Sequence, residues 1–239
     1  MTACTPIDSF PTMPIPPGFI FQRWVLRFSV ALGLLSPCFA GLRATEPKSQ
    51  FDPQIGAPLS VRDRPALGSE KARIVVVEAI SYKCAHCRAF NERVFPRLRE
   101  SYIDSGKVRW ILVTASDDPL DAETKIFTIG RCMQRQGKFW NALDALIQNG
   151  NRPSSFLMDV MTRIPAVDGT DLSFCVQDRA IRQEVYADFA DYARLGAHGT
   201  PTFFIRKLLP DGQRTEARIE GYQSFEYFQK VFDDLLKAP

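Results

Sequence analysis

Cys84 and Cys87 carry the clearest capacity for chemistry in this sequence. Two cysteines separated by two residues can close a small-ring disulfide, and a helix that begins at the first cysteine favours its thiolate form. Lys83 and His86 add positive charge beside Cys84. The pattern therefore predicts a redox centre that exchanges its disulfide with the thiols of another molecule.

Three other kinds of site share this cysteine spacing. A zinc site needs two more ligands at suitable spacing, and Cys132 and Cys175 stand isolated in the sequence. A c-type haem needs a histidine directly after Cys87, where Arg88 stands. A purely structural disulfide stays open, although a buried strand that runs into a helix is an unusual place for one. We expect no metal and no organic cofactor, because the two sulfurs suffice for the chemistry.

Pro201 and Glu78 are the other residues whose settings indicate a function. Pro201 opens the apolar run 201–205, and proline fits only the start of such a strand because it cannot donate to the hydrogen-bond ladder. A cis Thr200–Pro201 bond would suit so tight an entry. Glu78 lies among Val and Ile, so we expect it to be buried, partly protonated and poised for proton transfer, unless it turns towards water. His198 precedes the proline, and we expect a solvated loop residue there, with a direct electrostatic role at the redox centre as the alternative.

The elements that must position these residues follow from the apolar pattern. The nearly continuous β-branched run 72–80 predicts a central strand buried on both faces, and a helix over 85–102 follows it, which Pro96 should kink. Strand 107–114 then completes a parallel βαβ unit. The remaining pattern predicts helices over about 117–133, 139–147, 154–164 and 178–195, strands over 201–205 and 216–220 around the turn 210–212, and a last helix capped by Ser224.

This order predicts an α/β fold with a helical domain inserted into its middle. The α/β domain would comprise residues 67–115 and 196–239, and the inserted helical domain residues 116–195. Residues 41–66 are polar and rich in proline, which predicts a linker and a loosely attached lead-in.

The first forty residues predict an export signal. A short basic region precedes the apolar run 28–35, and the small residues that follow suit cleavage after Ala40. The run is far shorter than the roughly 20 residues of a membrane-spanning helix. Two alternatives stay open: a start at Met13, and lipidation of Cys38, which the proline before it makes a poor site.

Export would leave four cysteines, because Cys4 and Cys38 depart with the leader. An even number of cysteines in an oxidising compartment suggests two pairs. We therefore expect Cys132 and Cys175 to form a structural disulfide within the insertion, with two buried free thiols as the alternative.

With these residues in place, the chain resembles the DsbA-type branch of the thioredoxin superfamily, the periplasmic disulfide oxidoreductases of bacteria. The resemblance covers about residues 67–236. It rests on the strand that ends Val76-Val-Glu78, the Cys84–Cys87 motif, the helical insertion and the run Gly199-Thr-Pro-Thr-Phe-Phe204. It implies a thioredoxin-like fold, an exposed first cysteine and a cis-proline opposite it.

The resemblance also implies a role for each matching residue. Cys84 matches the nucleophile and Cys87 the resolving cysteine. His86 matches the histidine that is common in oxidising members of the family. Pro201 matches the cis-proline, with Thr200 as the neighbour that contacts the backbone of the substrate.

Glu78 matches the buried acid beneath the disulfide in these enzymes, whereas Ala85 departs from the family, which frequently has proline there. Because the residues between the cysteines tune the stability of the thiolate, the redox potential of this chain cannot be assigned from that of the family. DsbA reaches a thiol pKa near about 3.5 and a potential near about −120 mV, against about 7 and about −270 mV in thioredoxin. The positive charge beside Cys84 favours an oxidase.

A disulfide oxidase, a disulfide isomerase and a reductase fed by a membrane electron carrier share these features. Exported isomerases of the superfamily carry an N-terminal dimerisation domain, for which residues 41–66 are too few, so we expect a monomeric oxidase in the periplasm. Its expected partners are exported proteins with free cysteines and, by analogy, a quinone-linked membrane oxidase. A redox-inert chaperone or a metal-binding module fits the cysteines less well. The net charge of +3, without a Lys/Arg run, argues against nucleic acid.

Overall fold

The computed structural model describes residues 64–116, 121–209 and 214–237. These residues belong to one compact unit, Glu46–Pro239. The predicted export signal, most of the predicted linker and the predicted turn at 210–212 lie outside the described residues. In the ranges just given, no helix combines the length and the apolar character that crossing a membrane requires.

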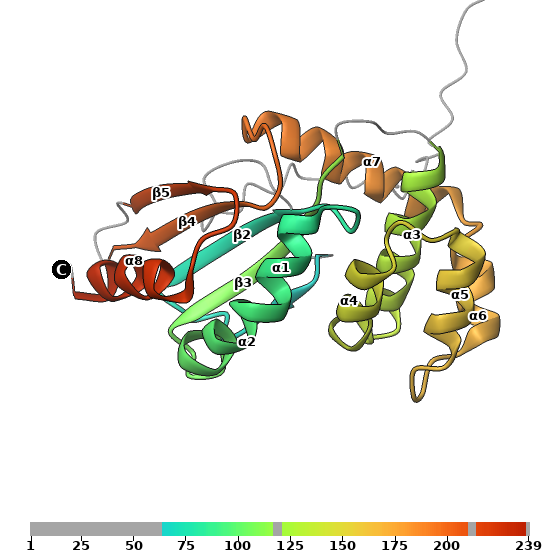
Figure 1. Ribbon diagram of the computed structural model, residues 1–239, viewed down its shortest axis with the longest axis horizontal. Helices are drawn as coiled ribbons and strands as arrows, with labels where there is room; N and C mark the ends of the chain where they lie inside the picture. Colours follow the sequence, from blue (N-terminus) through green and yellow to red (C-terminus); the bar gives the residue numbers. More distant parts are fainter. Residues whose placement is uncertain (1–63, 117–120, 210–213, 238–239) are drawn as a thin grey trace, which may run out of the picture. The chain divides into compact units, whose positions relative to one another are not determined.

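Strands and helices alternate at first, a series of helices follows, and a pair of strands with a final helix ends the chain (Figure 1). The described strands are β1 (Ala66–Leu67), β2 (Ile74–Ile80), β3 (Val108–Thr114), β4 (Thr202–Leu208) and β5 (Arg214–Glu220). The described helices are α1 (Ala85–Arg93), α2 (Phe95–Leu98), α3 (Asp121–Arg135), α4 (Phe139–Gln148), α5 (Ser154–Thr162), α6 (Gly169–Cys175), α7 (Arg179–Arg194) and α8 (Phe225–Lys237), with the π-helical turn η1 (Arg99–Ile103).

The strands form one mixed sheet in the order β1-β3-β2-β4-β5. β2 and β3 run parallel, with Val76 opposite Trp110, while β4 runs antiparallel on the other side of β2, with Phe203 opposite Glu78. Every residue of β2 is buried, as expected for a central strand covered on both faces. The strand that carries Glu78 and leads to the cysteines is therefore the innermost part of the sheet.

Alternate residues of β2 face two different apolar clusters. Ile74 and Val76 pack with residues of α1, α2 and α8, which lie in front of the sheet in Figure 1. Val75 and Val77 point to the opposite face. A third cluster fills the interior of α3 to α7 and reaches Cys87, so the second cysteine lies where the helices between β3 and β4 meet the sheet.

The helix after the cysteines is divided more sharply than the sequence predicts. The expected kinked helix over 85–102 is instead α1, a break at Val94, then α2 and η1. Pro96 lies in the first turn of α2. Proline is tolerated in that turn because its missing N–H would have no partner within the helix.

α6 is a helix that the sequence pattern did not predict. It has seven residues, and Leu172 is its one buried residue, so it shows no apolar period. Its start is nevertheless fixed by Asp168, whose side chain accepts hydrogen bonds from the N–H groups of Thr170 and Asp171.

Residues 64–67 are held more firmly than the loosely attached lead-in that the sequence predicts. Ala66 and Leu67 pair with β3, and the carbonyl of Pro65 accepts a hydrogen bond from the N–H of Leu112 at 2.9 Å. Arg64 is only 5% exposed. A strand of two residues is too short to leave a period-2 pattern in the sequence.

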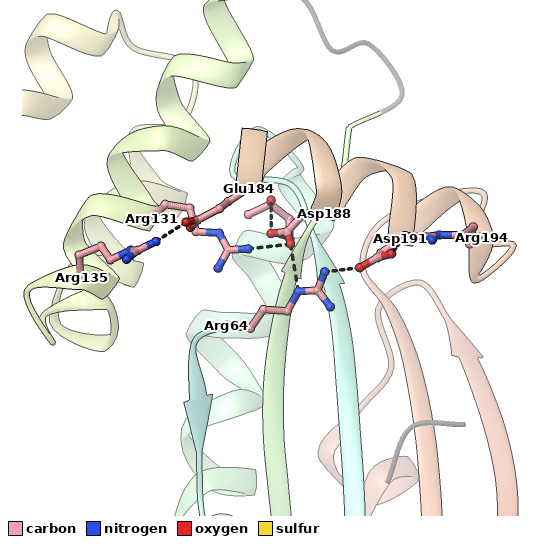
Figure 2. A network of polar contacts seen from close by, with 8 residues as sticks. Arg64, Arg131, Arg135, Glu184, Asp188, Asp191 and Arg194 are labelled. Atoms are coloured by element: carbon pink, nitrogen blue, oxygen red, sulfur yellow. Dashed lines mark hydrogen bonds and ion pairs between the residues drawn. The ribbon is translucent and has the colours of Figure 1, made fainter. Parts of the chain in front are cut away.

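Arg64 belongs to a network of buried charges (Figure 2). Its Nε donates to the carboxylate of Asp188 at 2.9 Å, and Nη2 of Arg131 donates to the same carboxylate at 2.8 Å. The hydroxyl of Thr114 donates to it as well, and Arg64 also pairs with Asp191. The network thus joins the lead-in, the end of β3, α3 and α7 by charge-assisted hydrogen bonds.

Candidate active site

Cys84 is the N-cap of α1, and Cys87 lies in the first turn of that helix. The N–H of Cys84 bonds to the carbonyl of Ser81 at 3.2 Å, so a tight turn delivers the chain from β2 to the helix. Cys84 is partly exposed and Cys87 is buried, and the structure contains both as free thiols. One sulfur is therefore accessible to another molecule while its neighbour is covered.

The surroundings of Cys84 favour its thiolate. The pKa of Cys84 is lowered from 9.0 to about 5, chiefly by a hydrogen bond from the side chain of Cys87. Burial opposes this, while a hydrogen bond with the Thr200 side chain and the backbone N–H groups of Cys87 and His86 reinforce it. These N–H groups are the unpaired donors of the helix start, so His86 contributes through its backbone.

The surroundings of Cys87 act in the opposite direction. Burial raises the pKa of the Cys87 thiol far above its usual range, and the hydrogen bond that it gives to Cys84 raises the pKa further. The nearby Glu78 carboxylate and the Cys84 thiolate add like-charge repulsion. At neutral pH the pair therefore consists of a Cys84 thiolate and a Cys87 thiol.

Glu78 lies in the middle of β2 and has no exposed surface. Its Oε2 accepts a hydrogen bond from Nε1 of Trp110 at 2.9 Å. Burial nevertheless raises the pKa of Glu78 from 4.5 to about 8, although hydrogen bonds with Trp110 and Asn91 counteract the shift. A carboxyl that titrates near neutral pH beside Cys87 can give a proton to the sulfur or take one from it.

The proline loop lies against Cys84, 116 residues away in the sequence. The Thr200–Pro201 bond is cis, and Sγ of Cys84 lies 3.1 Å from the carbonyl oxygen of Thr200. The carbonyl of Pro201 accepts a hydrogen bond from the N–H of Gly221, which ties the loop to the end of β5. The loop therefore presents backbone directly beside the accessible sulfur.

Lys83 and the two histidines that the sequence singled out all lie on the surface. Lys83 and His86 are exposed on either side of Cys84, and His198 is exposed before the proline loop. His198 thus occupies the solvated position expected from the sequence. The structure brings together Cys84, Cys87, Glu78 and the loop at Thr200–Pro201. Lys83, His86 and His198 are exposed next to these segments in the sequence.

Two glycines fit the active-site turn against the inserted helices, and neither was singled out by the sequence. A Cβ on Gly150 would lie 2.2 Å from the carbonyl oxygen of Tyr82, and one on Gly130 would lie 2.5 Å from its hydroxyl. Tyr82 precedes the cysteines by two residues and is buried. A larger residue at 150 would push the backbone of the turn away, and one at 130 would have to displace the buried ring of Tyr82.

Trp110 and Asn91 are the polar partners of Glu78 that sequence reasoning missed. Trp110 lies in β3 opposite Val76, and Asn91 lies in α1, one turn after Cys87. The sequence does hold a sign for Asn91: it stands four residues after Cys87, which places both on one face of the helix, and its neighbour Phe90 is apolar. Trp110 gave no such signal, because it reads as an ordinary core residue.

Cys132 of α3 and Cys175 of α6 are joined by a disulfide, with 5.8 Å between their Cα atoms. This bond lies among the inserted helices, and its sulfurs are distinct from the thiols at the start of α1. Across the part of the chain that the structure describes, no cluster of three His, Cys, Asp or Glu side chains could hold a metal ion.

The family model described as Thioredoxin matches residues 60–228. This chain belongs to the thioredoxin family. Among curated proteins, the probable disulfide bond formation protein D of Bacillus cereus is 28% identical over 185 residues, which cover 72% of this chain and 78% of that protein. A putative protein-disulfide oxidoreductase of Rickettsia bellii is 26% identical over 147 residues, or 58% of this chain and 55% of that protein.

Solved structures place this thioredoxin-family chain in the DsbA-type branch. The crystal structure of Wolbachia pipientis alpha-DsbA1 matches with a TM-score of 0.62 and 26% identity, over 74% of this chain and 92% of that one. Oxidised BdbD from Bacillus subtilis matches with a TM-score of 0.63 over 75% and 96%, and at 19% identity it shows the fold alone. The predicted α/β, thioredoxin-like fold and the DsbA-type resemblance are confirmed.

Proposed function

We propose that this chain exchanges disulfides at Cys84 and Cys87 and introduces disulfide bonds into exported proteins. The enzyme class, a thiol–disulfide oxidoreductase, follows from the family and from relatives named disulfide bond formation protein and protein-disulfide oxidoreductase. The observation that carries the proposal is the opposite setting of the two sulfurs. Cys84 has a lowered pKa and is accessible, while Cys87 has a raised pKa and is buried.

The proposed reaction begins with the oxidised pair. A thiolate of the substrate attacks Sγ of Cys84, the bond between Cys84 and Cys87 breaks, and Cys87 leaves as a thiolate that takes a proton from neutral Glu78. A second thiolate of the substrate then attacks the substrate sulfur of the mixed disulfide. The substrate keeps its new disulfide, Cys84 leaves as a stabilised thiolate, and the enzyme has gained the two electrons.

Thr200 and Pro201 are the proposed contact for the substrate backbone. The carbonyl of Thr200 lies 3.1 Å from Sγ of Cys84, so an extended peptide that reaches this sulfur also meets the loop. Main-chain contacts of this kind are independent of the side chains of the substrate. We assign His86 a supporting role at the rim, where it is exposed beside Cys84.

The proposed division into domains follows the elements. Residues 67–115 and 196–239 contain the strands from β2 onward together with α1, α2 and α8, and residues 116–195 contain α3 to α7. The disulfide between Cys132 and Cys175 joins the first helix of this insertion to its fourth. We propose that it stabilises the insertion and takes no part in exchange.

Export to the periplasm is the proposed location. The basic region, apolar run and small residues before position 41 support a signal peptide. The proposed partners are exported proteins with free cysteines and a quinone-linked membrane oxidase that restores the disulfide, and the proposed state is a monomer. No role with nucleic acid is proposed.

The deciding experiment is the reduction potential of the Cys84–Cys87 pair, measured by equilibrating the purified protein with glutathione buffers. A value well above about −180 mV supports an oxidase, and a value near about −270 mV would make the protein a reductase instead. A Cys132→Ser/Cys175→Ser variant that lacks residues 1–40 assigns the measured potential, because Cys84 and Cys87 are then its only cysteines. Cys84→Ser should show no redox transition in the same buffers, which would assign the transition to the Cys84–Cys87 pair.

A further inference from the structure

Two buried oxygen atoms beside the redox pair have no hydrogen-bond partner among the described residues: Oε1 of Glu78 and Oδ1 of Asn91. Glu78 is fully buried and Asn91 is only 5% exposed. A buried polar atom without a partner costs about 1–3 kcal/mol. Such atoms in a folded protein call for an explanation. Here one belongs to Glu78 and the other to Asn91, a side chain that affects the pKa of Glu78.

Asn91 bridges Glu78 and the turn of Cys87. Its Nδ2 donates to the backbone carbonyl of Cys87 at 3.0 Å, one turn back along α1. Its side chain also lies close enough to Glu78 to lower the pKa of that carboxyl, although Oε1 of Glu78 and Oδ1 of Asn91 have no hydrogen-bond partner in the described part of the chain. Oε2 of Glu78 accepts from the indole of Trp110, so Oε1 is the carboxyl oxygen that remains open, beside an amide whose own oxygen is also open.

A carboxamide can pair with either protonation state of a carboxyl group. Neutral Glu78 carries an O–H that can donate to Oδ1 of Asn91, whereas the carboxylate accepts an N–H from Nδ2. A turn of the terminal amide exchanges the two ends, at the expense of the bond from Nδ2 to the Cys87 carbonyl, and this torsion is soft. Leucine has the same shape but neither group, and aspartate lacks the donor.

We propose that Asn91 is a positioning residue for proton transfer at Cys87, because its amide accepts from neutral Glu78 and donates to ionised Glu78. Glu78 can then exchange a proton with Cys87 in both directions while its open oxygen has a partner in each protonation state. The inference rests on the proposed function and adds a residue to it.

The step in question is the resolution of a mixed disulfide. Ionised Glu78 takes the proton of Cys87, and the Cys87 thiolate attacks Sγ of Cys84. The new bond joins the two cysteines, the bond from Cys84 to the bound partner breaks, and the partner leaves as a thiolate. Asn91 holds the Glu78 carboxylate before the transfer and the neutral carboxyl after it.

The test follows this step with glutathione disulfide. The reduced protein is mixed rapidly with glutathione disulfide, quenched with acid, and the decay of the Cys84–glutathione adduct is followed by mass spectrometry from pH 5 to pH 9. The hydrogen-bonding effect of Asn91 lowers the pKa of Glu78, so in Asn91→Leu that pKa should rise. We expect the rising part (the rising limb) of the plot of decay rate against pH to shift to higher pH by about one unit, which slows decay of the adduct near pH 7 about tenfold. Asn149→Leu, which removes a comparable amide bond to the carbonyl of Ala145, serves as the control and keeps the wild-type limb.

The same Asn91→Leu substitution in a Glu78→Gln variant separates a positioning role of Asn91 from a merely structural effect. In Glu78→Gln the carboxyl is absent, so adding Asn91→Leu should leave the pH profile where it was. An equal slowing at all pH values, or the same slowing in both backgrounds, would overturn the inference. Should Asn91→Leu fail to fold, Asn91→Asp keeps the shape, and it should move the limb upward as well because a second acid faces Glu78. Wild-type adducts that never resolve would instead refute the proposed exchange function.

Discussion

Glu78→Gln should make the protein more stable at neutral pH, although the residue lies at the centre of the active site. The carboxyl is fully buried, and burial raises its pKa from 4.5 to about 8. The folded chain therefore retains a proton that the unfolded chain loses as the pH rises above 4.5. An acid with a raised pKa destabilises the folded state with increasing pH, since the unfolded state gains from ionisation first.

The size of the effect follows from the two pKa values. Between them, the free energy of unfolding falls by about 1.4 kcal/mol for each pH unit. From pH 5 to pH 7 the wild type should lose about 2–3 kcal/mol through Glu78 alone. Glutamine retains an acceptor for the indole of Trp110 and does not titrate in this range, so Glu78→Gln should lack this loss.

The assay is denaturant unfolding of the disulfide form at several pH values, because bonded cysteines do not titrate. The quantity compared is the difference between the variant and the wild type, which should grow by about 2–3 kcal/mol in favour of the variant from pH 5 to pH 7. Glu92→Gln is the matched control, since Glu92 is exposed on the same helix as Cys87, and its curve should follow the wild type. Parallel curves for Glu78→Gln and the wild type would refute the conclusion that burial holds Glu78 neutral.

Three further outcomes follow from the structure. The pKa of Cys84 is lowered to about 5, so the free energy of unfolding of the reduced protein, relative to that of the disulfide form, should rise with pH from about 5 to 9 and fall as the pH drops through 5. Reduced Cys84→Ser, which cannot form the disulfide, should lack this rise when it is compared with the reduced wild type at the same pH values. Asp188→Asn removes the carboxylate charge that the buried guanidinium groups of Arg64 and Arg131 share, and it should cost about 3–5 kcal/mol in denaturant unfolding. The exposed Asp234→Asn should cost less than about 0.5 kcal/mol, and similar costs for the two variants would contradict the network. Replacing both Cys132 and Cys175 with serine opens a loop of 43 residues and should cost about 4 kcal/mol in the loop-entropy estimate, while an unchanged reduction potential would agree with a structural role.

The local features of the site could be predicted because each depends on neighbours in the sequence. A nearly continuous run of β-branched residues gives a strand buried on both faces, and the structure has it at Ile74–Ile80, two residues shorter than expected at its start. The cysteine pair opens a helix, as expected, because the residues after Ile80 turn and then show a helical period. The proline that opens β4 could be placed for a similar reason, since a ladder excludes it from the interior of the strand.

The long-range contacts left no pattern to follow. Arg64 and Asp188 are 124 residues apart, and each reads in the sequence as an ordinary surface charge. The apolar period assigns Asp188 to a helix but gives no sign that the carboxylate lies inside. Charge pairs leave such a sign only when their partners lie three or four residues apart on one helix, as Lys230 and Asp234 do. The lead-in was therefore expected to be loose, although Arg64 anchors it.

One hydrogen bond contributes to the opposite pKa shifts of the two sulfurs, and burial adds to the shift of Cys87. The thiol of Cys87 donates to Cys84, which lowers the pKa of the acceptor and raises the pKa of the donor. Any change that weakens this bond should therefore bring the two pKa values together, making Cys84 a poorer leaving group and Cys87 an easier nucleophile. The first change slows oxidation of substrates and the second speeds the release of bound partners. In the proposed mechanism Glu78 supplies or removes the proton of this bond, and burial raises its pKa to about 8, so we expect the balance to shift just above neutral pH.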